Sequence, residues 1–443
     1  MQFAPKVYYL SNGIPVILDA MDTGLVYVSV NFNSGGYDEK PTEYGITHFC
    51  EHMFGKETER FPTKVARTEF LENNGGRVNG VTSPTYMAVY GDILAKNTDK
   101  LIDVLADELN NALFNQATID NERKVIINEL HRAMDNSERQ MSEFTRTSLL
   151  GISVPDGRVT LGNEQILKSF TREQLVQHAR KMMSAKNSFI CISGKIYDQD
   201  ALLKKLDNLF AKWSNHHVEH KQYKYNSVSY AHHSGNTRNV SINICLPGLY
   251  DDTYKNIYQN TVISTFENYL NKELMKVLRY NNGLVYGIDY DEISYGGCNI
   301  KIFETQTEPE NIGKVTALMA QTMANVYNTC PVTNDDLNRF RTQTERLNEL
   351  ILESGETRCN TLSAYWSNYD VLYDFNKELE MVKNITTEDV IKYTRGYFEN
   401  PISILTHGAD YKDNLLQIWN DNFKIQTSEN HMLNGLLNQN RGK

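Results

Sequence analysis

The stretch GITHFCEHMFGKE, residues 45–57, contains two histidines four positions apart and a glutamate between them. In a helix, His48 and His52 lie one turn apart on the same face, where two imidazoles can bind one metal ion. Glu51 lies at the edge of that face, where a carboxylate can take a proton from a metal-bound water. The stretch therefore predicts a helix that carries a metal site and its general base. A surface helix with polar residues is the alternative.

A second helix is expected in IDNERKVIINELHRAMD, residues 119–135. Catalytic zinc sites usually have three protein ligands and one open position, so His48 and His52 require a further ligand. Glu122 and Glu129 lie seven residues apart, or two helical turns, and therefore share a face of this helix. Glu129 is the expected third ligand, with Glu122 beside it. A solvated acidic helix face is the alternative.

The arrangement H-x-x-E-H is the inverted zinc-peptidase motif, and 76 residues separate it from Glu129. In both respects the sequence resembles the pitrilysin family of zinc peptidases, which includes subunits of the mitochondrial processing peptidase and small bacterial homologues. The resemblance implies that His48, His52 and Glu129 bind one Zn²⁺ per chain, with Glu51 as general base and Glu122 as a supporting acid. It also implies a zinc-dependent endopeptidase that hydrolyses peptides or unfolded segments inside a closed chamber.

A second element of the same family is found in LMKVLRYNNGLVYGIDY, residues 274–290, which is similar to the pattern R-x-x-x-G-L-x-Y. The resemblance implies that Arg279 and Tyr286 bind the substrate and stabilise the oxyanion. A guanidinium and a phenol are suitable for this role, because both can donate hydrogen bonds to a carbonyl that gains negative charge.

The region around the metal motif shows one further match and two departures. The segment GGRVNGVTSPTYMAVY, residues 75–90, is similar to the family's edge strand beside the metal. Asn79 and Gly80 are therefore expected to bind the substrate backbone as an added β-strand. Cys50 stands where relatives usually carry a larger apolar residue, and FGKETERFP, residues 54–62, has its glycine in a different place. We expect Cys50 to pack in the core, with metal binding as the alternative.

The chain contains an internal repeat. The segments SFTREQLVQHARKMMSAKNSFICISGKI, residues 169–196, and NITTEDVIKYTRGYFENPISILTHGADY, residues 384–411, share a pattern at an offset of 215 residues. Each predicts a capped helix followed by a strand that ends at Gly194 or Gly408. Duplication of one domain accounts for the repeat, and chance similarity of two helix-strand segments is the alternative.

These patterns predict an α+β fold with two homologous domains, each with a mostly antiparallel sheet packed by helices. The expected divisions are an N-terminal zinc-binding domain, a polar linker, a C-terminal domain with the Arg-Tyr element, and a polar tail, at residues 1–213, 214–226, 227–425 and 426–443. In the resembled family, four such domains close like a clamshell. The resemblance therefore implies half a clamshell completed by a homodimer, and a heterodimer with a homologous subunit stays open.

Composition limits the partners and the compartment. The 443 residues carry a net charge of -10, which argues against sequence-independent binding to nucleic acid. The first residues do not resemble a targeting peptide, and no apolar run approaches the length of a membrane span. The six cysteines form no C-x-x-C pair, so a reducing cytoplasm is the expected location. Whether a leader precedes residue 1 is left open.

Two other functions are compatible with parts of the sequence. A peptide-binding or scaffolding homologue would keep the fold without the chemistry, although such homologues lack the zinc ligands that this chain has. A metal-dependent oxidoreductase can also use two histidines and one carboxylate. Glu51 and its peptidase-like surroundings argue against the oxidoreductase.

Overall fold

The computed structural model describes residues 3–154, 157–249 and 257–425, so the predicted tail at 426–443 lies outside the described residues. The chain forms two compact units. Unit 1 comprises Met1–Ala133, Ser153–Lys221 and Leu347–Phe375, and unit 2 comprises Met134–Ile152, Gln222–Arg346 and Asn376–Lys443. The predicted domains are continuous stretches of sequence, and their boundaries stay a prediction. Each compact unit, in contrast, also contains a segment from the other half of the chain.

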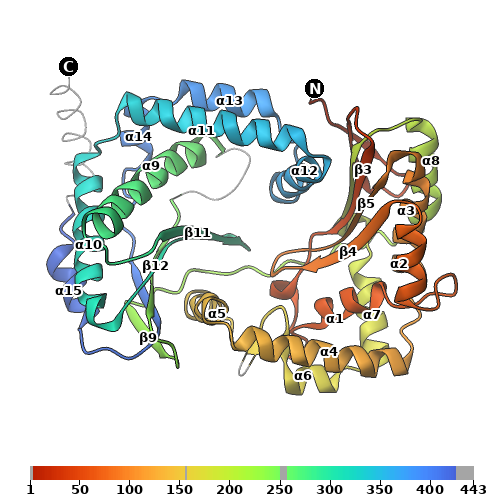
Figure 1. Cartoon of the computed structure of the whole chain (residues 1–443), viewed down its shortest axis with the longest axis horizontal. Coiled ribbons are helices and arrows are strands. Elements are labelled where there is room, and N and C mark those ends of the chain that lie inside the picture. The colour runs from red at the N-terminus through yellow and green to blue at the C-terminus, as the bar shows by residue number, and fades with distance from the viewer. Residues whose placement is uncertain (1–2, 155–156, 250–256, 426–443) are drawn as a thin grey trace. The chain divides into compact units, whose positions relative to one another are not determined.

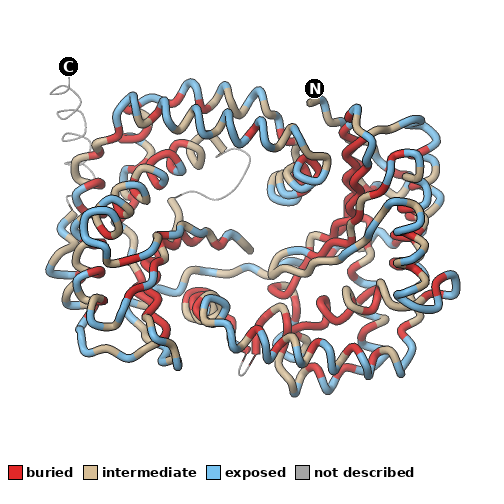
Figure 2. The backbone as a smooth tube through the Cα atoms, viewed as in Figure 1, coloured by how far each residue is buried: buried red, intermediate tan, exposed pale blue. Residues whose placement is uncertain are grey.

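Unit 1 is built on a six-stranded sheet with the order β1-β2-β8-β3-β5-β4. Only β2 and β8 pair in parallel. Its strands are β1 (Lys6–Tyr9), β2 (Pro15–Ala20), β3 (Leu25–Phe32), β4 (Gly76–Thr82), β5 (Met87–Leu94) and β8 (Ser188–Gly194). Every residue of β8 is buried, as expected for a central strand covered on both faces. Figure 2 shows such buried residues in red along the strands.

Helices cover both faces of this sheet. The helices α1, α2 and α3 pack on the side of β4 and β5, whereas α12 packs against β3 and β8 from the opposite side (Figure 1). The helices of unit 1 are α1 (Ile46–Phe54), α2 (Lys64–Glu72), α3 (Thr98–Asn111), α4 (Gln116–Met134), α6 (Glu164–Ser169), α7 (Arg172–Met182), α8 (Gln199–Phe210) and α12 (Gly355–Tyr369). A short ladder of β6 (Gly157–Arg158) and β7 (Gly162–Asn163) precedes α6.

Unit 2 is built on a five-stranded sheet with the order β11-β12-β10-β13-β9. Its strands are β9 (Tyr230–Ser234), β10 (Val240–Pro247), β11 (Ile288–Tyr295), β12 (Cys298–Thr307) and β13 (Ser403–Gly408). Its helices are α5 (Ser137–Leu150), α9 (Ile257–Met275), α10 (Ile312–Thr329), α13 (Phe375–Asn384), α14 (Thr387–Tyr393) and α15 (Leu415–Asn422), while α11 (Asn334–Glu353) spans the division between the units.

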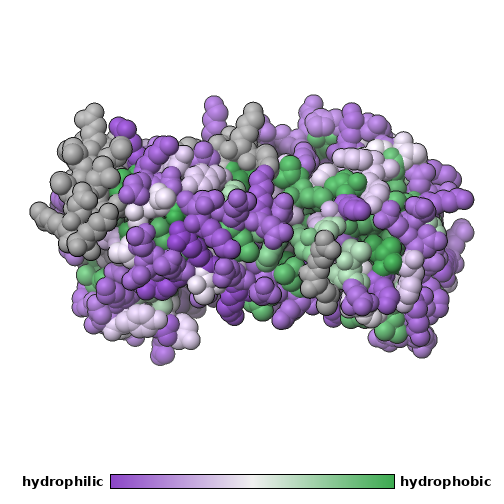
Figure 3. Space-filling view, turned by 90° about the horizontal axis from the view of Figure 1, so that it is seen from above, coloured by the Kyte–Doolittle hydropathy of each residue, from purple (hydrophilic) through white to green (hydrophobic). Residues whose placement is uncertain are grey.

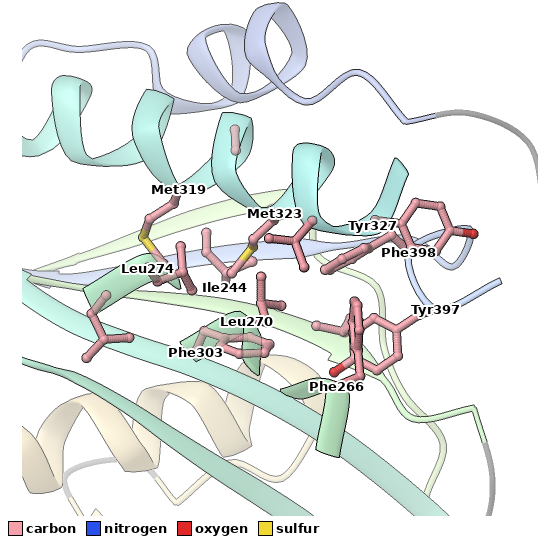
Figure 4. Close-up of a cluster of buried hydrophobic side chains, with 14 of the residues drawn as sticks. Ile244, Phe266, Leu270, Leu274, Phe303, Met319, Met323, Tyr327, Tyr397 and Phe398 are labelled. Carbon is pink, nitrogen blue, oxygen red and sulfur yellow. The ribbon is translucent and has the colours of Figure 1, made fainter. Parts of the chain in front are cut away.

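The core of unit 2 lies between α9, α10 and the sheet. Figure 4 shows Phe266 and Leu270 of α9 together with Met319 and Met323 of α10, next to Phe303 of β12. All five side chains are fully buried. Burying large apolar side chains of this kind contributes about 1.5–3 kcal/mol each, so this cluster is a main source of stability for the unit.

The two units share one strand topology. The order β2-β8-β3-β5-β4 corresponds to β9-β13-β10-β12-β11, with a parallel pair first and antiparallel pairs after it. In the repeated segments, Thr171 and Thr386 each form a capping box at the start of a helix. The strands that follow end at Gly194 and Gly408, with φ angles of 142° and 120°. The predicted α+β fold with two homologous sheet-and-helix domains is confirmed.

Each unit contains one helix from the other half of the chain. In unit 1, α12 packs on the sheet, and the Arg358 guanidinium donates two hydrogen bonds to the Asp19 carboxylate, with both side chains fully buried. In unit 2, α5 packs on β13, and the Thr145 hydroxyl is hydrogen-bonded to the Asn243 amide at 3.1 Å. The sheets are therefore completed by segments that are distant in sequence.

Within the described ranges, no helix is long and apolar enough to cross a membrane. Figure 3 shows hydrophilic side chains, in purple, spread over the face that is drawn, with smaller green hydrophobic areas between them. All six cysteines are free thiols and all are buried.

Candidate metal centre

The helix α1 carries the H-x-x-E-H motif, and its first turn is held by a buried carboxylate. Gly45 precedes the helix with φ 91°, a conformation that suits glycine. Glu39 accepts hydrogen bonds from the backbone N–H groups of Gly45 at 2.7 Å and of Thr47 at 2.8 Å. These contacts satisfy donors that helix ends leave unpaired, so they fix the position of α1.

The side chains of His48, His52 and Glu129 converge at one point. Glu129 Oε2 lies 3.8 Å from His48 Nε2 and 3.5 Å from His52 Nε2. The ligand atoms of all three residues lie within 4.8 Å of one another, and this is the one such group found among the described residues. Tetrahedral zinc with bonds near 2.1 Å separates its ligand atoms by about 3.4 Å. The donor types fit zinc, and the two distances to Glu129 Oε2 are close to this value. A zinc ion held by these three residues would have one position left for water.

The surroundings of the two histidines shift their pKa values in opposite directions. Burial, together with the nearby His52, lowers the pKa of His48 to about 4, so this imidazole is neutral at pH 7 as a metal ligand must be. Burial also lowers the pKa of His52, but hydrogen bonds to Glu122 and Glu129 outweigh it and raise the value to about 9. A metal ion at this point would displace the proton that His52 otherwise holds.

Glu51 lies beside the cluster, next to the edge strand β4. Its Oε2 atom is 4.0 Å from His48 Nε2 and accepts a hydrogen bond of 3.0 Å from the Thr82 hydroxyl. A Cβ atom at Gly80 would lie 2.6 Å from Glu51 Oε1, so the glycine leaves room for the carboxylate. Burial raises the pKa of Glu51 above its ordinary value, which increases its basicity.

The strand β4 lies at the end of the sheet and pairs only with β5 among the described strands. Asn79 is exposed on it, and its amide lies 3.5 Å from the Tyr90 hydroxyl. An exposed strand edge offers unpaired backbone groups to an extended peptide. Both residues predicted to bind substrate backbone, Asn79 and Gly80, therefore lie on an edge next to Glu51.

Glu122 lies beside the Nδ1 atom of His52, whereas Glu129 lies beside Nε2. Its Oε2 atom is 3.1 Å from His52 Nδ1, and its Oε1 atom is 2.7 Å from Lys56 Nζ. Burial raises the pKa of Glu122, but the hydrogen bonds from His52 and Lys56 outweigh it and the pKa falls below its ordinary value. An ionised Glu122 can thus hold the Nδ1–H of His52 and leave Nε2 for a metal.

Two residues near this cluster were missed by the sequence predictions. Lys56 stands four residues after His52, and Thr82 stands two residues after Gly80 on the same strand. The spacing of Gly80 and Thr82 places both on one face of β4, whereas helical spacing does not place Lys56, because it lies past the end of α1. Cys50 is fully buried, donates to the Leu175 carbonyl at 3.4 Å and is not in the ligand group.

Arg279 and Tyr286 belong to unit 2, whereas the histidine cluster belongs to unit 1. Arg279 lies in a π-helical turn, Lys276–Asn281, directly after α9, and such turns are frequent at functional sites. Its guanidinium carbon lies 4.7 Å from the centre of the Tyr286 ring, and Tyr286 is 87% exposed. Both side chains line a cavity of about 890 Å³ within unit 2, next to the edge strand β11.

Comparison with family models separates the part of the chain that carries the metal ligands from the part that carries Arg279 and Tyr286. Residues 16–152 match the model described as "Insulinase (Peptidase family M16)". Residues 169–344 match the model described as "Peptidase M16 inactive domain". The first match contains the whole His-His-Glu cluster, and the second contains Arg279 and Tyr286.

Curated proteins of similar sequence are peptidases by name. An "Uncharacterized zinc protease" of Rickettsia bellii is 22% identical over 401 residues, which cover 89% of this chain and 95% of that protein. A "Probable mitochondrial-processing peptidase subunit beta" of Arabidopsis thaliana is 29% identical over 211 residues, which cover 47% of this chain but only 39% of that protein.

A solved structure shares the fold. The M16 inactive domain from Pseudomonas fluorescens matches with a TM-score of 0.80 at 14% identity, covering 93% of this chain and 99% of that chain. At this identity the match bears on the fold alone, and it agrees with the two sheet-and-helix units described above.

Proposed function

The chain belongs to the M16 peptidase family, and we propose that it is a zinc-dependent endopeptidase that hydrolyses peptides or unfolded segments. The observation that supports this most directly is the approach of the His48, His52 and Glu129 ligand atoms to within 4.8 Å, with the Glu51 carboxylate beside them. Relatives named as zinc proteases support the same metal. Zinc would be held by His48 Nε2, His52 Nε2 and Glu129 Oε2.

The chain's own residues would perform the proton transfers. Zinc, when bound, supplies acidity to a water molecule and polarises a carbonyl. Glu51 takes the proton of the attacking water and later gives it to the leaving amine, and its burial raises its pKa in the direction that this base function requires. Thr82 holds the Glu51 carboxylate in place through the hydrogen bond of 3.0 Å. Glu122 holds His52 in the tautomer that a metal needs.

Substrates would bind as an added strand. The edge of β4 at Asn79 and Gly80 pairs only with β5 among the described strands, so its other side would take an extended peptide backbone next to Glu51. A folded protein rarely offers an unpaired strand, so peptides and unfolded segments are the expected substrates. Arg279 and Tyr286 would donate hydrogen bonds to the oxyanion.

The proposal includes a dimer whose active sites use residues of both chains. One chain carries both the metal set and the Arg-Tyr set, so two copies in a closed chamber can each complete the other's site. The relative named as a "subunit beta" supports association with a homologous chain. Mixing a Glu51→Gln chain with an Arg279→Ala chain tests this, because activity returns only if each supplies what the other lacks. No recovery in a verified mixed dimer contradicts the shared site, and a requirement for a different homologue indicates a heterodimer.

The first experiment measures zinc content and cleavage of a fluorogenic peptide pool, followed by mass spectrometry of the products. We expect one zinc per chain and internal cleavage that a chelator abolishes and added zinc restores. Absence of both zinc and cleavage would favour the peptide-binding or scaffolding homologue, and iron with no cleavage would favour the oxidoreductase. A cytoplasmic location is also proposed, because all six cysteines are free, and cell fractionation checks it.

A further inference from the structure

Lys56 is joined to the metal cluster through two consecutive contacts. It lies in the turn after α1, where its backbone N–H donates to the Met53 carbonyl at 3.3 Å. Its ammonium lies 2.7 Å from Glu122 Oε1, and Glu122 Oε2 lies 3.1 Å from His52 Nδ1. The side chains of Lys56 and Glu122 are only 20% and 10% exposed, so both contacts are largely shielded from water.

The two carboxylate oxygens of Glu122 contact different partners. Oε2 accepts the Nδ1–H of His52, so Nε2 is the ring nitrogen that faces Glu129 Oε2, at 3.5 Å, and that would be left for a metal. Oε1 is held by Lys56. A carboxylate fixed at one oxygen cannot rotate freely about its terminal bond, so the Lys56 contact also fixes the oxygen that holds His52.

Lys56 reaches Glu122 from the turn that ends α1. The helix ends at Phe54, Gly55 caps it, and from the next position the Lys56 ammonium extends to Glu122 Oε1. The nearby Arg67 is engaged with the buried Glu108, and Lys64 is exposed at the start of α2. Lys56 is thus the cation that the fold directs to Glu122.

We propose that Lys56 is a positioning residue for the metal centre, acting through Glu122 to hold His52 in its metal-binding orientation. The inference rests on the proposed function. Removal of an outer partner of a metal-bound histidine typically costs 10–100-fold in metal affinity. Because Lys56 is one contact further out, its removal should weaken zinc binding by about 10-fold, the lower end of that range.

The test measures zinc affinity of the full chain by competition with a chromogenic chelator of known affinity. The variants are Lys56→Met, Lys56→Arg, Glu122→Gln and the double variant Lys56→Met with Glu122→Gln. Lys168→Met is the matched control, since Lys168 forms an exposed ion pair with Glu164 in the same unit. Thermal unfolding in excess chelator reports any general loss of stability without metal.

We expect Lys56→Met to weaken zinc binding by about 10-fold, Lys56→Arg to restore most of it, and the metal-free melting temperature to match that of the Lys168→Met control. In the Glu122→Gln background, Lys56→Met should have no further effect, because the path runs through Glu122. Zinc affinity equal to the control, or additive losses in the double variant, would overturn the proposal. Failure of the wild-type chain to bind zinc would instead contradict the proposed function itself.

Discussion

The two units use one strand topology for different purposes, and the difference is clearest in α1, which follows β3 in unit 1, and α9, the first described helix after β10 in unit 2. In unit 1, α1 directs His48 and His52 toward Glu129, with nitrogen and oxygen atoms facing a common point. In unit 2, the corresponding helix α9 directs a buried carboxylate, Glu267, into contacts that occupy both of its oxygens.

Those contacts are short hydrogen bonds. Glu267 accepts from the Tyr290 and Tyr397 hydroxyls, each at 2.6 Å. Glu267 therefore has a structural role in unit 2, because its hydrogen bonds link α9 to β11 and to the segment before β13. Within the described residues, a metal-ligand group is found only in unit 1. The corresponding helices of the two units therefore carry polar side chains with different partners: possible metal ligands in unit 1 and tyrosine hydroxyls in unit 2.

The largest expected effect is at Glu51, the glutamate of α1 that lies beside the candidate metal ligands. Glu51→Gln should lower kcat by about 10²–10⁴-fold with zinc content unchanged, because a general base is lost and no ligand is removed. Steady-state cleavage of a fluorogenic peptide and metal analysis measure both quantities. The control is Glu72→Gln, an exposed glutamate at the end of α2. Cleavage that survives Glu51→Gln would remove Glu51 from the chemistry.

The next contrast is between α12 and α5, the two helices that pack in the unit formed mainly by the other half of the chain. A buried ion pair holds α12, whereas a neutral hydrogen bond holds α5. Arg358→Met should reduce the free energy of unfolding by about 3–5 kcal/mol, because it leaves Asp19 buried without its partner. Thr145→Val should cost only about 1 kcal/mol. Denaturant unfolding measures both. Equal losses would show that the ion pair has no special part in anchoring α12.

Glu267→Gln tests the packing role in unit 2. Hydrogen bonds to a charged group contribute about 1.5–3 kcal/mol, so the variant should lose stability of this order in denaturant unfolding. Its zinc content should equal that of the wild-type chain. Loss of zinc on this substitution would mean that the Glu267 carboxylate of unit 2 supports the metal centre as well.

The smallest effect concerns pH. Burial and the charge of Lys181 lower the pKa of His178 to about 4 from an ordinary 6.5. A histidine kept neutral in the folded state stabilises the fold above the ordinary pKa, and this stability is lost as pH falls from about 6.5 toward about 4. At pH 5 the loss should be about 1–2 kcal/mol. His178→Gln in chelator should reduce this loss, and an unchanged pH profile would contradict the assignment.

The sequence predictions succeeded where local patterns decide the structure. The helix-strand repeat was visible because a capped helix and a strand ending in glycine depend on neighbouring residues, as at Thr171 and Gly194. The spacing of His48 and His52 was equally readable, because four residues make one helical turn. The structure brings their ligand atoms together with that of Glu129.

The parts that sequence reasoning missed depend on contacts between distant segments. Asp19 and Arg358 are 339 residues apart, and no periodicity in either segment indicates which sheet α12 will cover. The roles of Lys56 and Thr82 require knowing which side chains face Glu122 and Glu51. Composition and spacing contain no such information, because a lysine after a helix is usually solvated.

Unit 1 includes α12, a helix from late in the chain, so this unit cannot be completed early in protein synthesis. Chain growth runs from the N-terminus, and residues up to Lys221 supply every strand of the first sheet. The helix that covers β3 and β8 begins only at Gly355. A ribosome must therefore make well over a hundred further residues before the buried Asp19 can meet Arg358. Until then one face of the first sheet is open to chaperones and to proteases.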